Sequence, residues 1–168
     1  MRSSPRRLLP LALLCCAFAP LVAMPASAQP GDSSRDDFRL EEVEWQRRVL
    51  LLFAPAAQGA RYRAQLQRLR AAPDSAFVER DLLLVTVPAE GEPRRRSWDA
   101  ESQAQPVSVE AALRLRERFG VADEDFAFVL VGKDGTEKRR DRAPVAPEAI
   151  FEEIDAMPMR QREMRERQ

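Results

Sequence analysis

The chain has 168 residues but only two cysteines and no histidine. Both cysteines, Cys15 and Cys16, lie in an N-terminal stretch that resembles a cleavable leader, so the mature protein is expected to contain no thiol. These absences exclude cysteine nucleophiles, histidine bases and metal sites built on thiolate or imidazole ligands. Because no disulfide can form in the mature chain, its stability must come from a hydrophobic core.

The mature chain is also poor in lysine, since Lys133 and Lys138 are its only two. The whole chain has 27 basic and 27 acidic side chains, and the leader contains three arginines and no acid. The mature chain therefore has a net charge of −3. This balance gives no electrostatic reason to expect nucleic acid as a partner.

The leader has the three parts of a signal peptide. Basic residues near the start precede an apolar run over residues 8–22, and residues 26–28 read Ala-Ser-Ala. We expect residues 1–28 to be a signal peptide that is cleaved between Ala28 and Gln29, and the protein to be exported, to a bacterial periplasm. The apolar run is short for a bilayer, so no membrane span is expected after cleavage, although a retained anchor helix stays open as the alternative.

The residues after the leader divide into two parts. Residues 29–37 are polar and contain glycine and proline, which predicts a flexible N-terminal segment. Residues 38–168 have the length of one domain.

The first half of this domain predicts two buried strands and a helix. Residues 49–53 form a continuous apolar run and residues 81–87 a largely apolar one; both are typical of buried strands, and we expect Pro55 and Pro88 to end them. Between them, apolar residues at helical spacing (Tyr62, Leu66 and Leu69) predict a helix that stops before Pro73. Residues 89–106 are polar and include three consecutive arginines at 94–96, which predicts a long surface loop.

The second half predicts a helix, a hairpin and a final helix. Ser108 can cap a helix that ends at Gly120. Residues 126–131 form an apolar strand, and residues 134–135 read Asp-Gly, a strong signal for a turn into a charged edge strand over 136–140. The helix that Ser108 caps is expected to bury an apolar face made of Val109, Ala112, Leu113 and Phe119. The last helix begins at Pro147, and its expected apolar face consists of Ile150, Phe151, Ile154 and Met157.

The resulting order is β-α-β-α-β-β-α. Two βα crossovers followed by a hairpin and a covering helix predict a thioredoxin-like α/β fold, with a mixed four-stranded sheet flanked by helices. In working thioredoxins the paired cysteines begin the first helix, where residues 58–61 of this chain read Gln-Gly-Ala-Arg. Thioredoxins also have a cis-proline just before the third strand, whereas no proline precedes the corresponding strand of this chain at Phe126. Thiol–disulfide oxidoreductase activity is therefore not expected.

Several short motifs resemble one known family. A Gly-Lys-Asp-Gly turn at 132–135, Lys138 and the stretch 154–164 are similar to the C-terminal motif of secreted bacterial proteins grouped as domain of unknown function 4174. Further similarity, at Trp45, Arg48, residues 53–55, Tyr62, Gln65 and residues 80–81, extends the resemblance over roughly residues 38–165. It implies a thioredoxin-like fold and no established activity, so it assigns no catalytic residue, cofactor or metal. We call the following the signature positions: Gly132, Lys133, Asp134, Gly135, Asp155, Met157, Pro158, Met159, Arg160, Glu163 and Met164.

Most signature positions have a structural interpretation beside a functional one. Pro158 must break the last helix, and we expect it to start a second short helix, with Met157 buried and Met159 and Met164 folded over the core edge or offered to a partner. The three methionines can also bind Cu(I), although the nearby arginines oppose this. Asp155 is expected to pair with Arg160 or Arg162. The acidic run at 123–125 is expected to be a solvated loop rather than a Ca²⁺ site.

Two function classes remain. We favour a non-catalytic binding module of the cell envelope, which holds a protein or peptide at the edge formed by residues 55–62 and 122–126. The alternative is an enzyme that depends on carboxylate and arginine chemistry, although no paired-carboxylate, nucleophile-elbow or phosphate-loop motif is present.

Overall fold

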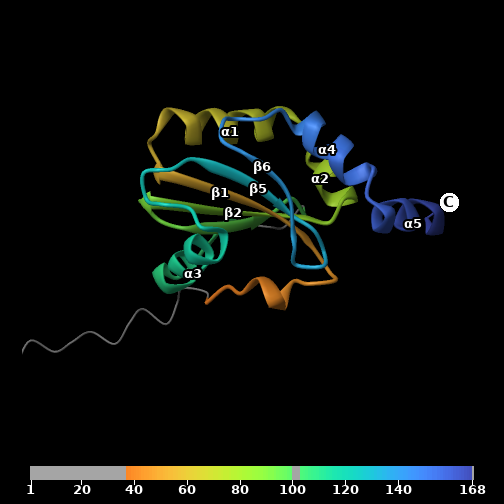
Figure 1. Cartoon of the computed structure of the whole chain (residues 1–168). Helices are drawn as coiled ribbons and strands as arrows, with labels where there is room; N and C mark the ends of the chain where they lie inside the picture. The colour runs from red at the N-terminus through yellow and green to blue at the C-terminus, as the bar shows by residue number, and fades with distance from the viewer. Residues whose placement is uncertain (1–36, 100–102, 168) are drawn as a thin grey trace, which may run out of the picture. The chain divides into compact units, whose positions relative to one another are not determined.

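The computed structural model describes residues 37–99 and 103–167 (Figure 1). The predicted leader and its cleavage site, and all of the predicted flexible segment except residue 37, lie outside these residues. Six strands occur in chain order: β1 (Arg48–Ala56), β2 (Leu82–Glu90), β3 (Arg94–Ser97), β4 (Gln105–Pro106), β5 (Ala127–Val131) and β6 (Glu137–Asp141). The helices are α1 (Ala60–Ala71), α2 (Asp74–Glu79), α3 (Val109–Phe119), α4 (Pro147–Asp155) and α5 (Pro158–Glu166), with a short 3₁₀ turn at Leu40–Glu42.

The strands form one mixed sheet in the order β4-β3-β2-β1-β5-β6. β1 lies parallel to β2, with Leu50 opposite Leu84, and antiparallel to β5, with Leu50 opposite Leu130. β1 lies inside the sheet, between β2 and β5, and its apolar run is buried on both faces of the sheet, as predicted. This burial explains why its sequence does not alternate between apolar and polar residues.

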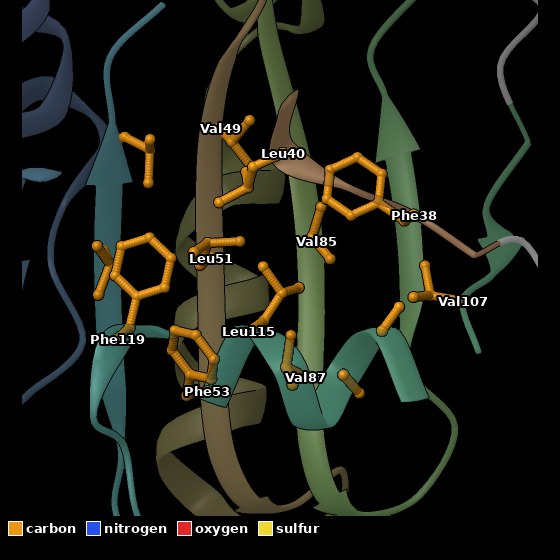
Figure 2. Close-up of a cluster of buried hydrophobic side chains, with 14 of the residues drawn as sticks. Phe38, Leu40, Val49, Leu51, Phe53, Val85, Val87, Val107, Leu115 and Phe119 are labelled. Atoms are coloured by element: carbon orange, nitrogen blue, oxygen red, sulfur yellow. The ribbon is translucent and has the colours of Figure 1, made fainter. Parts of the chain in front are cut away.

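Successive residues of the central strands supply two separate cores. Leu50 and Leu52 pack under α1, α2 and α4, while Leu51 and Phe53 face α3 and the N-terminal 3₁₀ turn. Figure 1 shows these helices on opposite sides of the sheet. In the second core, Phe38 and Leu40 from the N-terminal segment pack with Leu51, Phe53, Leu115 and Phe119 (Figure 2). The predicted α/β architecture is therefore confirmed.

The strand count differs from the prediction of four. Within the predicted surface loop, residues 94–97 and 105–106 form β3 and β4, which extend the sheet beyond β2. β3 pairs with β2 through its backbone, so its arginine side chains stay half-exposed at the sheet margin and leave no apolar pattern. β1 and β2 also continue past Pro55 and Pro88, because Ala56 still pairs with Glu90 beyond both prolines. Helix α2 is a further element that the sequence pattern does not predict.

Helix α3 has the predicted ends but a different buried face. The Ser108 hydroxyl oxygen accepts a hydrogen bond from the Ala111 N–H at 3.1 Å, and Gly120 ends the helix with φ 57°. Val109 and Leu113, however, are 49% and 57% exposed. The buried face consists of Ala111, Ala112, Leu115, Arg116 and Phe119. The prediction of an apolar face through Val109 and Leu113 is wrong, because the helix is rotated so that the 111–115–119 row meets the sheet.

The C-terminal corner forms largely as predicted. α4 begins at Pro147 and ends at Asp155, and Pro158 is the first residue of α5. Ile150 and Ile154 are fully buried. Met157 is only half-buried, so its predicted burial is wrong. The reason is that the chain turns away from the sheet at this residue, so its side chain packs only on the margin of the core.

Candidate functional site

A surface groove with a volume of about 410 Å³ lies where three distant parts of the chain meet. Arg48 comes from the start of β1, Lys133 from the β5–β6 turn, and Met157 from the α4–α5 corner. The groove is also lined by Gly132, Asp134, Lys138, Glu153, Pro158, Met159 and Arg162. We call it the signature groove, because six signature positions line it.

The turn at residues 132–138 forms one wall of the groove, and its contacts explain the spacing between the Gly-Lys-Asp-Gly motif and Lys138. The Gly132 N–H donates to the Thr136 carbonyl oxygen at 2.9 Å, and Lys138 Nζ donates to Asp134 Oδ2 at 2.6 Å. Asp134 Oδ1 also accepts from the Thr136 N–H at 3.2 Å and from its hydroxyl at 2.9 Å. A Cβ atom at Gly132 would lie 2.6 Å from Lys138 Cε and 2.7 Å from Asp134 Oδ1, so another residue here would displace these two side chains from their pairing. The motif therefore builds a closed local turn.

A buried network lies behind the groove. Arg48 is 1% exposed and donates from Nη1 and Nη2 to Glu163 at 3.2 and 3.1 Å. Lys133 Nζ lies 2.8 Å from Glu163 Oε1 and 2.8 Å from Asp81 Oδ2. Among the described residues, Arg48 Nε is the fully buried side-chain nitrogen that has no hydrogen-bond partner. Glu163 therefore pairs with two cations that come from distant parts of the chain, the start of β1 and the β5–β6 turn.

A second network surrounds Asp155 at the corner. Arg160 is fully buried and donates from Nε to Asp155 Oδ1 at 3.1 Å and from Nη1 to the Glu79 carbonyl oxygen at 2.9 Å. Arg80 Nε also donates to Asp155 Oδ1, at 3.1 Å. The expected pairing of Asp155 with Arg160 is confirmed, whereas Arg162 lines the groove instead. These bonds tie the corner to the end of α2.

Neighbouring cations lower the pKa values of Glu163, Asp155 and Asp134. Burial alone would raise the pKa of Glu163, but hydrogen bonds from Lys133 and Arg48 outweigh it and hold the pKa below its ordinary value. For Asp155, burial is similarly outweighed by Arg80 and Arg160, so its pKa is also lowered. Asp134 shows the same balance, with Lys138 and Thr136 lowering its pKa. A general base tuned toward neutral pH would need a raised pKa, which none of these groups has.

The remaining predicted residues lie elsewhere. Met164 is half-buried on α5 and does not line the groove, so the structure brings together only Met157 and Met159. Gly135 occupies the positive-φ position of the turn, with φ 70°. The stretch 58–61 begins α1, where the thioredoxin comparison places it. Of the two segments of the predicted docking edge, Tyr62 lines one cavity and Asp123 another.

The acidic run at 123–125 is exposed, and the Asp123 carboxylate lies 3.7 Å from Arg116 Nε. Across the described ranges, no three histidine, cysteine or acidic residues are grouped as ligands for a metal ion.

Sequence reasoning missed the partners of the signature positions. Arg48, Arg80 and Asp81 belong to the N-terminal resemblance, but nothing in the sequence connects them to Glu163 or Asp155. One local signal existed, because Arg48 directly precedes an uninterrupted apolar strand. A buried arginine in such a position needs an acidic partner.

The parallel β1–β2 pair, the β5–β6 hairpin and the covering helices define a thioredoxin-like α/β protein with two additional strands. Residues 39–163 match the family described as "Domain of unknown function (DUF4174)", which spans both networks. The chain belongs to this family.

Two mammalian proteins show similarity over the same length. The sushi repeat-containing protein SRPX of Rattus norvegicus and that of Mus musculus are each 32% identical over 125 residues, which is 74% of this chain. The aligned region is only 26% of either relative, so this chain corresponds to about a quarter of those proteins. No solved structure gives a significant match. Within the part of the chain that the structure describes, no helix is both long and apolar enough to cross a membrane.

Proposed function

We propose that the chain is a non-catalytic binding module of the cell envelope, and that its signature groove holds an acidic peptide segment with an apolar side chain. The observation that supports this most directly is the state of the charged groups around the groove. Arg48, Lys133 and Lys138 are each bonded to a carboxylate of the same chain. These pairs hold the three side chains in position before a ligand binds, which suits a binding surface better than proton transfer.

The lining of the groove favours this ligand class. Four cations line it, and three of them, Arg48, Lys133 and Lys138, are already paired with carboxylates of the chain. Arg162 is exposed and makes no ion pair with a described residue. Met157, Pro158 and Met159 add an adaptable apolar surface. A carboxylate next to a leucine- or phenylalanine-type side chain complements both features.

An exposed tryptophan next to the groove extends the proposed surface. Trp45 donates its backbone N–H to the Lys133 carbonyl oxygen at 2.7 Å, and its residue is 68% exposed. Its φ of 64° is unusual for a residue other than glycine. Tryptophan is enriched among the residues that dominate the energy of protein interfaces. Strained backbone at an exposed aromatic residue supports a role in contact with a partner.

Panning a random peptide library against the purified protein tests the proposal. We expect enrichment of peptides in which aspartate or glutamate adjoins an apolar residue. By fluorescence polarisation, Arg162→Glu should weaken a selected peptide about tenfold or more. Arg165→Glu is the matched control, because Arg165 is exposed on the same helix but does not line the groove. No enrichment, enrichment of basic peptides, or equal effects of the two variants would refute the proposal.

Two sequence-based alternatives have less support. The lowered pKa values of Asp134, Asp155 and Glu163 do not suit an enzyme that uses a carboxylate base at neutral pH. Cu(I) would have to bind Met157 and Met159 among the groove's cations. A Cu(I)-dependent rise in melting temperature that the Met157/Met159 double alanine variant abolishes would replace our proposal with copper binding.

Export is part of the proposal and rests on the leader at 1–28. The intact mass of protein recovered outside the cytoplasm should correspond to a chain that begins at Gln29. A species that retains residues 1–28 would contradict export by cleavage.

A further inference from the structure

A second cavity, of about 330 Å³, lies on the α1 side of the sheet and shares no lining residue with the signature groove. Helix α1 forms one wall, β2 forms the floor, and β3 forms the other wall. The strand that makes this second wall lies within the predicted surface loop. One wall of the cavity is thus made by a strand that extends the sheet beyond β2.

The interior of the cavity is apolar and aromatic. Leu69 and Leu84 line it and are 2% and 6% exposed. Trp98, which is 5% exposed, is held by stacking on Phe77 with ring centroids 4.1 Å apart and planes 6° apart. This packing fixes the indole ring in place. The volume falls within the range of about 300–1,000 Å³ that is typical of small-molecule sites.

Two donors on buried side chains of this cavity lack partners within the described chain. Tyr62, the only tyrosine of the chain, is 9% exposed, and its hydroxyl makes no hydrogen bond with any described residue. The indole N–H of Trp98 likewise has no partner among the residues that the structure describes. Neither atom is among the fully buried, unpaired side-chain atoms of the described residues, so both donors remain accessible to a molecule in the cavity. A ligand that accepts hydrogen bonds here would satisfy both donors.

The rim of the cavity is cationic. Thr86 and Leu84 of β2 pair with Arg94 and Arg96 of β3, and the alternation of a strand places both arginines on one face. Together with Arg70 and Arg95, they line the cavity against one acid, Asp74. Arg94 Nε donates to the Glu92 carboxylate at 2.9 Å, and the Arg96 guanidinium lies 3.7 Å from the Asp74 carboxylate. The four side chains of these two pairs, Arg94, Glu92, Arg96 and Asp74, are each at least 40% exposed. Exposed ion pairs of this kind are weak and can exchange for a ligand's charge.

We propose that this cavity binds a small organic acid, with its carboxylate between Arg94, Arg96 and the Tyr62 and Trp98 donors and its apolar body against Leu69, Leu84 and the indole ring. The inference is independent of the peptide site, because the two cavities are built from different residues. Each part of the ligand has a counterpart: the rim supplies charge, Tyr62 and Trp98 supply hydrogen bonds, and the leucines supply apolar contact.

Titration calorimetry with octanoate tests the proposal, with octan-1-ol as the uncharged probe of equal length. We expect one octanoate to bind per chain. Octan-1-ol should bind at least about tenfold more weakly, because hydrogen bonds to a charged group are stronger than those to a neutral one. In ¹⁵N-correlated spectra, octanoate should shift the indole N–H signal of Trp98 but not that of the exposed Trp45. An absence of saturable binding, or equal affinity for the two probes, would overturn the proposal.

Variants of residues that line the cavity test whether octanoate binds there. Arg94→Gln combined with Arg96→Gln should weaken octanoate about tenfold or more, and Tyr62→Phe should weaken it about tenfold. The matched control is Arg63→Gln, because Arg63 is exposed on α1 and does not line the cavity. If the double variant does not fold, Tyr62→Phe and Arg70→Gln supply the same test. Unchanged octanoate affinity in the folded cavity variants would also overturn the proposal, and loss of peptide binding alone would leave it standing.

Discussion

Arg48, the first residue of β1, forms a two-pronged hydrogen bond with Glu163 of α5, 115 residues later in the chain. Arg48 Nη1 also donates to the Arg80 carbonyl oxygen at 3.1 Å. The last helix is thereby attached to the central strand through a charge that has almost no contact with solvent. An uncompensated charge at this position would be costly, so the pair is expected to determine whether α5 stays docked.

Glu163→Gln should destabilise the protein by about 3 kcal/mol, because it leaves Arg48 buried without an opposite charge. Glu166→Gln is the control, since Glu166 is exposed on the same helix and makes no ion pair with a described residue; its effect should be within about 0.5 kcal/mol. Urea denaturation of both variants measures the difference in the free energy of unfolding. Equal stabilities would show that α5 is not held by this pair.

Stability should fall in acid between about pH 5 and pH 3, because the pKa values of Asp155 and Glu163 are lower in the folded chain than the ordinary values of about 3.9 and 4.3. A carboxylate with a lowered folded pKa stabilises fully above its unfolded pKa and loses this contribution as the pH drops through the folded value. Urea unfolding measured across this range should show the loss, and Asp155→Asn should flatten it. A wild-type curve that stays level down to pH 3 would contradict this linkage.

Met157→Ala should cost only about 1–2 kcal/mol, because half-burial leaves less apolar area to lose than a full core site. Ile154→Ala, at a fully buried site one turn earlier, should cost about 2–5 kcal/mol. Thermal and urea unfolding of the two variants compare the sites. A larger loss at Met157 than at Ile154 would mean that the corner packs more deeply on the core than the structure shows.

Gly91→Ala should be more destabilising than Gly120→Ala, although both glycines have positive φ, 126° and 57°. A Cβ atom at Gly120 meets nothing within 4 Å, so alanine there bears only the left-handed strain of about 1–2 kcal/mol. At Gly91 the added Cβ would also lie 2.8 Å from Ala57 Cβ, which forces the backbone to shift. Melting temperatures of the two variants decide the order, and the reverse order would refute the stated cause.

The central strands could be predicted because each is apolar on both faces, and a short, continuous apolar run bounded by proline or glycine is typical of a strand inside a sheet. The caps of α3 and the turn at Gly132 to Thr136 were equally predictable, since their bonds join residues within a few positions of one another. β3 was not predictable, because its three arginines show no apolar alternation and its pairing depends on the free edge of β2.

In the signature groove too, the local features could be predicted from the sequence and the contacts between distant segments could not. The hairpin motif and the Pro158 break are local features and appear in the sequence. That Arg48 bonds to Glu163 behind the groove, or that Arg80 bonds to Asp155, depends on how strands and helices pack. A salt bridge between residues 115 positions apart leaves no periodic trace in a single sequence.

The sequence by itself determined the order of the main strands and helices, the absence of cysteine from residues 58–61, where thioredoxins hold theirs, and the positions of the signature turn and corner. Each of these depends on residue type or on spacing within a few turns. Only the tertiary structure decided that the arginine run becomes a strand, that Met157 is half-buried, and that Tyr62, Arg94 and Trp98 share a cavity. The physical reason is that these outcomes follow from contacts between distant segments, where packing and backbone pairing override local propensity.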